Sequence, residues 1–167
     1  VTVEVSVVNQ SGDPIGGATF TVTWDNGSTT DTTRNNGKRF VDVPDDKRLT
    51  IEVDADDYVR NEPYVVSTLS EDDTIEVSMY KTAVADITVR DDQGGVGNAE
   101  VTLQKRGTDQ APVINGTTNP DGTISSGFIE AGTYDLDVIK RGYLRNTTRL
   151  AVNGSTETTV ALEPASV

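Results

Sequence analysis

The chain has 167 residues, of which 27 are Asp or Glu and 14 are Lys or Arg, so its net charge is −13. A field of that sign repels phosphates and anionic lipid, which argues against nucleic acid as a partner. The sequence contains no His and no Cys. This excludes Ser-His-Asp catalysis, thiol nucleophiles and zinc sites built on imidazole or thiolate. No segment approaches the roughly 18 apolar residues of a membrane span, so membrane insertion is not expected.

Alternating apolar residues predict short strands through the first half of the chain. A period of two is what a strand with one buried face requires. We expect strands at residues 3–7, 18–24, 49–53 and 75–79. In the second of these, Thr residues alternate with apolar ones, as is typical of a strand with a solvated face. No window of eleven residues shows a helical apolar stripe.

The second half of the chain repeats the pattern. Strands are expected at residues 87–89, 99–103, 134–138 and 160–162. Asn-Gly and Asp-Gly pairs, which favour tight turns, separate the strands at residues 26–27, 36–37, 121–122 and 153–154. Many short strands with turns at this spacing predict an all-β sandwich architecture.

The two halves also share motifs, which predicts two tandem copies of one module. Tyr58-Val59-Arg60-Asn61 matches Tyr143-Leu144-Arg145-Asn146, at a period of 85 residues. A period measured between the first strands is 82, and loop insertions account for such a drift. We therefore expect one domain at residues 1–81 and a second at residues 82–167. The joint between them contains no Gly- or Ser-rich linker.

Both halves of the chain resemble a known domain family. Residues 12–18, Gly-Asp-Pro-Ile-Gly-Gly-Ala, resemble the G-x-P-[IV]-x-[GN]-A opening of carboxypeptidase regulatory-like domains. The second copy matches the rest of that pattern, with Thr118, an Asp-Gly turn, then Gly-Thr-Tyr at 132–134 and Gly142-Tyr143. The first copy departs from it, with Asp57-Tyr58 in place of Gly-Tyr. The resemblance implies two immunoglobulin-like or transthyretin-like Greek-key β-sandwiches. It supplies no catalytic residues.

The composition resembles that of proteins from halophilic archaea. Asp outnumbers Glu, 18 to nine, Arg outnumbers Lys, nine to five, and Thr is abundant. Repulsion among so many acids weakens when the Debye length shrinks to about 3 Å at roughly 1 M salt. We therefore expect a salt-adapted protein.

Calcium is the one metal ion that the sequence favours. Asp54, Asp56 and Asp57 supply hard oxygen ligands in an expected loop. Their spacing is not that of an EF-hand, and acids that hold water and cations in high salt explain them equally well. No other cofactor is expected.

Five Asn-X-Ser/Thr sequons raise the question of glycosylation. In order of preference, the candidate acceptors are Asn115 and Asn153, then Asn26 and Asn146. The fifth sequon begins at Asn9. Chance produces some sequons in a chain this rich in Asn and Thr.

These observations favour a non-catalytic structural, spacer or adhesion module on a cell envelope or virion surface, which contacts other protein subunits or neighbouring domains. The alternative is an accessory module of a secreted hydrolase that binds carbohydrate or calcium. A hydrolase in its own right would need two carboxylates at a fixed separation. An extracellular location fits the sequons and the acidic surface.

Overall fold

A computed structural model describes residues 1–165. Within that range the chain forms sixteen strands and no helix, which confirms the predicted all-β fold class. No element there has the length and apolar character of a membrane-spanning helix. The chain divides into two compact units, Val1–Lys81 and Thr82–Val167, and the boundary falls inside strand β9 (Tyr80–Asp91). We call them the N-terminal and C-terminal units.

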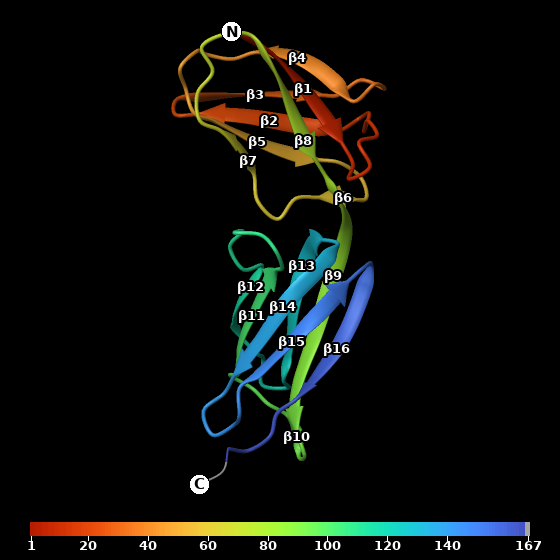
Figure 1. The fold of residues 1–167 in the computed structure, drawn as a ribbon, viewed down its shortest axis with the longest axis vertical. Helices are drawn as coiled ribbons and strands as arrows, with labels where there is room; N and C mark the ends of the chain where they lie inside the picture. Colours follow the sequence, from red (N-terminus) through yellow and green to blue (C-terminus); the bar gives the residue numbers. More distant parts are fainter. Residues whose placement is uncertain (166–167) are drawn as a thin grey trace. The chain divides into compact units, whose positions relative to one another are not determined.

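The N-terminal unit is a sandwich of two sheets (Figure 1). One sheet has the order β4-β1-β8, in which β1 pairs antiparallel with β4 and parallel with β8. The other has the antiparallel order β3-β2-β5-β7. The strands are β1 (Thr2–Val8), β2 (Thr19–Trp24), β3 (Gly27–Thr32), β4 (Lys38–Asp42), β5 (Leu49–Asp54), β7 (Tyr64–Val66) and β8 (Asp73–Ser78). A short strand, β6 (Tyr58–Val59), pairs with the first two residues of β9.

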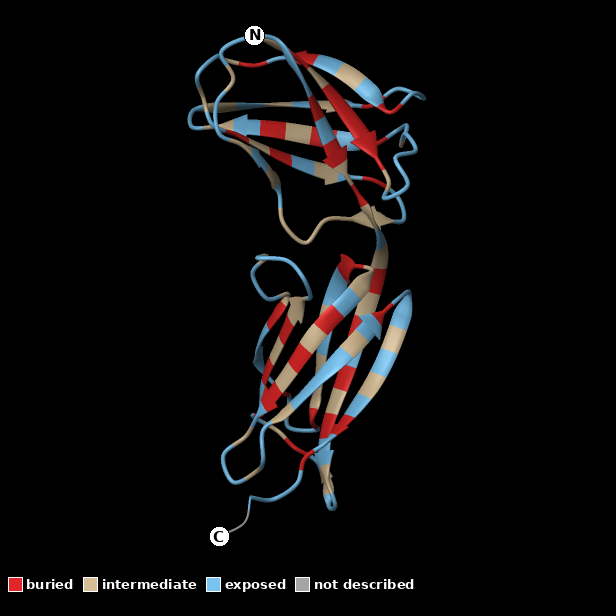
Figure 2. Ribbon diagram, in the orientation of Figure 1, coloured by how far each residue is buried: buried red, intermediate tan, exposed pale blue. Residues whose placement is uncertain are grey.

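The core of this unit lies between its two sheets, where inward residues of each strand are buried (Figure 2). Val3, Val5 and Val7 of β1 are fully buried, as their alternation predicts. Phe20 and Ile51 cover them from the opposite sheet. The apolar face of each strand therefore identifies which side of the sheet meets the core.

The C-terminal unit has the same two-layer plan. In one sheet β9 lies between β13 and the parallel strand β16, and it also pairs with the short β10. The other sheet has the antiparallel order β12-β11-β14-β15. The strands are β10 (Gly94–Gly95), β11 (Glu100–Lys105), β12 (Ile114–Thr117), β13 (Thr123–Glu130), β14 (Gly132–Ile139), β15 (Asn146–Val152) and β16 (Ser155–Ala161). Ile87, Leu103, Tyr134 and Leu136 are among its buried core residues.

One buried threonine makes the same hydrogen bonds in both units. In the N-terminal unit the Thr33 hydroxyl accepts from the Ala18 N–H (3.0 Å) and donates to the Ile15 carbonyl (2.8 Å). In the C-terminal unit Thr118 accepts from the Ala99 N–H (3.0 Å) and donates to the Val96 carbonyl (2.7 Å). Each hydroxyl thus satisfies the hydrogen bonds of two backbone groups.

The turn that follows is also shared. The N–H of Gly37 donates to Arg34, and the N–H of Gly122 donates to Asn119, both at 2.8 Å. Both glycines have positive φ, 76° and 87°. A Cβ at Gly122 would lie 2.3 Å from the Val89 carbonyl oxygen, so the backbones approach too closely for any other residue.

Sequence reasoning did not identify the outer strands β3, β4, β7, β12, β13 and β15. β3 has the sequence Gly-Ser-Thr-Thr-Asp-Thr, without one large apolar residue. Such strands lie at sheet edges and bury little of their surface, so they carry no clear period-two apolar signal.

Candidate functional site

The three predicted calcium ligands lie together in sequence, at the junction of β5 and β6. Asp54 ends β5, while Asp56 and Asp57 form the turn that follows, and all three are exposed. Asp57 has a positive φ of 67°. Across residues 1–165, no three or more Asp, Glu, His or Cys side chains are arranged to hold a metal ion. Calcium binding at these residues stays a prediction.

The candidate glycosylation sites occupy two kinds of position. Asn26 lies in the turn between β2 and β3, and Asn153 in the turn between β15 and β16. Asn115 lies within strand β12, and Asn146 begins β15, so these two are strand residues rather than turn residues. Asn26, Asn115 and Asn153 are exposed, whereas Asn146 is partly buried. Their glycosylation stays a prediction.

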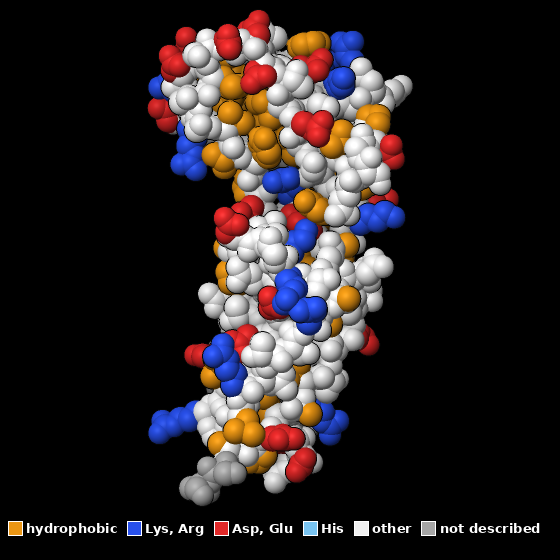
Figure 3. Space-filling view, in the orientation of Figure 1, with side chains coloured by type: hydrophobic (Ala, Val, Ile, Leu, Met, Phe, Trp, Pro, Cys, Tyr) orange, Lys and Arg blue, Asp and Glu red, His pale blue; other side chains and the backbone are white. Residues whose placement is uncertain are grey.

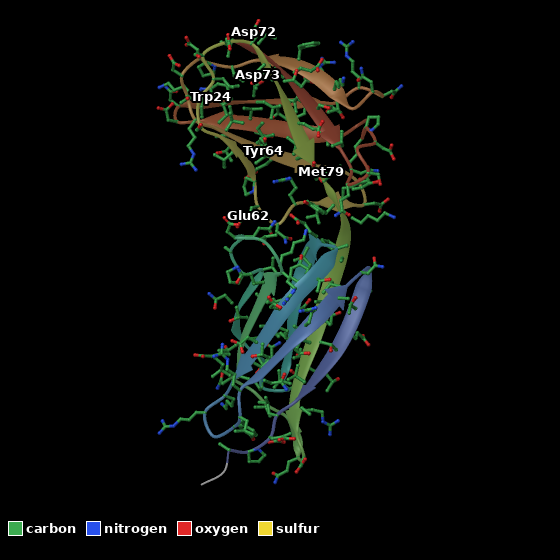
Figure 4. All side chains as sticks on the ribbon, in the orientation of Figure 1. Trp24, Glu62, Tyr64, Asp72, Asp73 and Met79 are labelled. Carbon is green, nitrogen blue, oxygen red and sulfur yellow. The ribbon has the colours of Figure 1, made fainter. Side chains whose placement is uncertain are left out.

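Two aromatic residues, Trp24 and Tyr64, serve the fold. Trp24 and Tyr64 are partly buried and pack against the core of the N-terminal unit (Figure 4). The Arg60 guanidinium lies 5.5 Å from the centre of the Tyr64 ring, which is a cation–π distance. Neither Trp24 nor Tyr64 offers the freely exposed ring face on which a sugar stacks.

The repeated tyrosine has a structural partner in the C-terminal unit. The Tyr143 hydroxyl donates to the Asp91 carboxylate at 2.5 Å. This hydrogen bond lowers the pKa of Asp91, with help from the Gln93 N–H, and raises the pKa of Tyr143. The bond ties the loop before β15 to the end of β9.

The first surface feature with mixed chemistry is a groove on the N-terminal unit, at edge strand β4. It has a volume of about 270 Å³, and we call it the N-terminal groove. Its lining residues are Glu4, Arg34, Asn36, Lys38, Arg39 and Phe40. Phe40 is 65% exposed, so its ring offers apolar surface at the groove. In Figure 3 basic and apolar side chains gather over β4, on a unit otherwise rich in acids.

The cations of this groove differ in their partners. Arg39 binds Asp31 of β3 at 3.0 Å, which ties the edges of the two sheets together. The Thr32 N–H, followed by the Arg39 guanidinium, holds the pKa of Asp31 below its ordinary value. Arg34 and Lys38 form no ion pair with any residue in 1–165. The Arg34 charge nevertheless acts on Asp31 as well, whose pKa it helps to lower.

The C-terminal unit has a groove at the matching place. It has a volume of about 660 Å³, and we call it the C-terminal groove. Glu4 pairs with Phe40 across β1 and β4, and Asp86 pairs with Ser125 across β9 and β13. The C-terminal groove is lined by Asp86, Ile87, Thr88, Asn119, Thr123, Ile124, Ser125, Glu157, Thr158 and Thr159. The C-terminal groove is thus lined largely by hydroxyls and carboxylates, whereas the N-terminal groove has cations and a phenyl ring.

A buried ion pair is the second polar feature of the C-terminal unit. The Lys105 ammonium lies 2.5 Å from the Glu130 carboxylate, and their side chains are 11% and 1% exposed. The Tyr134 hydroxyl donates to the Glu130 carbonyl at 2.6 Å. Gly132 lies beside the lysine, since a Cβ there would meet Lys105 Cε at 3.0 Å. Sequence reasoning missed this cluster because its three polar residues come from three different strands.

A scan against protein-family models found no match to the chain, and a search of curated proteins found no significant one. Membership of the carboxypeptidase regulatory-like family therefore stays a prediction.

Among solved structures the chain is distantly similar to several bacterial proteins, including pilins. The Bacillus anthracis TIE protein matches at 18% identity with a TM-score of 0.45, over 98% of this chain and 34% of that one. GBS52, the minor pilin of Streptococcus agalactiae, matches at 12% identity with a TM-score of 0.45, over 98% of this chain and 97% of that one. The shaft pilin SpaA of Lactobacillus rhamnosus GG matches at 10% identity with a TM-score of 0.44, over 99% of this chain and 98% of that one. Similarity this distant does not carry function.

Proposed function

We propose that the protein is a structural or adhesion module of an extracellular assembly, acting through protein–protein contacts. The observation that carries this proposal is the exposure of Phe40 and Phe128, at 65% and 76%. Both lie on edge strands, β4 and β13, whose places in the two units correspond. Large apolar groups on a sheet edge favour contact with another protein surface.

In-cell photo-crosslinking tests the contact surface. A photoreactive phenylalanine analogue at position 40 or 128 should capture protein on the surface of the native cell or virion. The same analogue at Ala151, an exposed residue of β15, should capture little. Capture of polysaccharide at position 40 instead would favour the accessory-module alternative, and equal capture at all three positions would contradict the proposal.

We further propose that the module works in high salt, and the charge distribution supports this. Residues 1–81 hold 16 acids against 7 bases, a net −9, and residues 82–167 hold 11 against 7, a net −4. Screening by salt relieves repulsion within each unit, more in the N-terminal one.

Thermal unfolding in KCl and in CaCl₂ separates salt adaptation from calcium binding. Salt adaptation predicts a melting temperature that rises steadily up to molar KCl, with no special effect of calcium. A large rise at millimolar CaCl₂ that Asp54→Asn and Asp57→Asn abolish would instead establish the calcium site. A melting temperature independent of KCl would contradict salt adaptation.

A further inference from the structure

We propose that copies of this chain associate head to tail, with Phe40 of one copy inserted into the C-terminal groove of another. The inference rests on the proposed contact function and names the partner as a second copy. It follows from two observations on different units: a projecting apolar side chain at one groove, and a hollow at its counterpart.

The projecting group is Phe40. It pairs with Glu4 and so shares the outer face of the sheet β4-β1-β8. With 65% of its surface exposed, the ring has apolar area to lose on contact. Its neighbours Arg34 and Lys38 carry positive charges that no ion pair within residues 1–165 neutralises.

The receiving surface is the C-terminal groove, the larger of the two at about 660 Å³. Ser125 stands where the N-terminal unit has Phe40, so a small side chain leaves space at that point. Ile124 also lines the groove, but it pairs with the buried Ile87 and packs against the core, so its side chain lies on the opposite face of β13 from Ser125. A phenyl ring entering here would displace water and lie against Thr88 and Thr123, which share the face of Ser125.

Charge at the two grooves is complementary. Asp86 and Glu157 are direct neighbours on the parallel pair β9 and β16, and both line the C-terminal groove. Arg34 and Lys38 flank the entering ring. Opposite charges across a contact favour the correct register and disfavour pairing of like surfaces. Two N-terminal grooves, or two C-terminal grooves, would not match each other.

The contact is heterologous, because the two surfaces differ. Each copy keeps one unused groove after pairing, so association continues into open chains unless the geometry closes a ring. The net charge of −13 opposes this in dilute buffer. Salt screens long-range repulsion, while partly buried contacts are screened much less. Association should therefore require high salt.

Analytical ultracentrifugation of the full chain in molar KCl tests the proposal. The unmodified chain should form species larger than a monomer as its concentration rises. Phe40→Ser removes the projecting ring and Ser125→Trp fills the hollow, and each should weaken association at least about tenfold. Val65→Ser, which removes another exposed apolar side chain from the N-terminal unit, is the matched control and should have no effect. Unchanged melting temperatures would show that the variants fold.

A mixture of the two defective variants gives the decisive result. Phe40→Ser keeps an open groove and Ser125→Trp keeps the ring, so together they should form a one-to-one dimer that grows no further. A monomeric unmodified chain at all salt concentrations, or a mixture that stays monomeric, would overturn the proposal. Protein crosslinks from position 40 to a different protein would then leave the contact function standing, whereas no crosslinks would remove both.

Discussion

The two units place opposite chemistry at one position of the same framework. Trp24 ends the six-residue strand β2, and Lys105 ends the six-residue strand β11. Each strand follows an alanine that donates to the shared buried threonine, so the two positions correspond. Trp24 lies against Gly27, where a Cβ would meet its Nε1 at 2.8 Å. Lys105 instead meets Glu130.

This difference shows that the fold accepts either an apolar or a charged side chain at the position of Trp24 and Lys105. A large apolar side chain covers the core in one unit, and a paired charge with a tyrosine does so in the other. The ionic solution is the more fragile, because a buried charge without its partner is strongly destabilising. The apolar solution has no comparable single weak point.

The largest effect is therefore expected from Glu130→Ala. It removes the carboxylate that lies 2.5 Å from the largely buried Lys105 ammonium, and breaking a buried ion pair by removing one member should lower the free energy of unfolding by about 3–5 kcal/mol. Urea unfolding followed by circular dichroism measures the loss. Hydrogen exchange read by mass spectrometry should place it in β11, β13 and β14.

The double variant Lys105→Met with Glu130→Leu is the control for that experiment. It replaces both charges with apolar groups of similar size, which is often neutral or stabilising. If the double variant lost as much stability as Glu130→Ala, the effect would come from packing and not from the broken ion pair.

The next effect compares the shared threonines. Thr33→Val and Thr118→Val each remove one hydroxyl that serves two backbone groups. Each should cost about 1–3 kcal/mol, because buried backbone groups lose their hydrogen bonds while side-chain volume is kept. Urea titration of the two variants should give similar losses. A loss in one unit only would contradict the equivalence of the two hydrogen-bond sets.

A smaller effect is expected where the units differ at a turn. Gly142 has a φ of 91°, and Asp57 adopts a φ of 67° at the matching position before the repeated tyrosine. Gly142→Ala should cost about 1 kcal/mol, because a Cβ disfavours this conformation. Asp57→Gly should stabilise the unit by only a few tenths of a kcal/mol, since Asp tolerates a positive φ better than Ala does. Thermal melts measure both changes, and stabilisation by Gly142→Ala would show that the turn does not hold that φ.

Sequence alone could predict the core strands, and the reason is physical. Phe20, Ile51, Leu136 and similar residues must alternate with polar ones to bury a single face, so their positions are visible in the sequence. The conformation at Asp57 could be anticipated from the same motif, since Gly142 precedes the matching tyrosine.

The two grooves and the buried ion pair could not be predicted in the same way. Phe40 and Ser125 correspond only through their pairing with Glu4 and Asp86, which depends on strand register. Lys105 meets Glu130 across 25 residues of sequence, and nothing local distinguishes either from a surface charge. Contacts between side chains of different strands are set by the folded arrangement.

The smallest effect concerns acid, and it again separates the units. Asp91 accepts from Tyr143 in the C-terminal unit, whereas Asn9 stands at the matching turn of the N-terminal unit and does not titrate. Because folding lowers the pKa of Asp91, its contribution to stability is present above the ordinary carboxyl pKa of 3.8 and is lost as pH falls through the lowered value. Tyr143→Phe removes the main cause of the shift, so this variant should lose less stability below pH 3.8 than the unmodified chain does. Melting temperatures across that range measure the difference. As a control, Asn9→Ala should lower the melting temperature, relative to the unmodified chain, by the same amount at every pH. If the melting temperatures of the Tyr143→Phe variant and the unmodified chain fell in parallel with acid, the hydrogen bond would not govern the titration of Asp91.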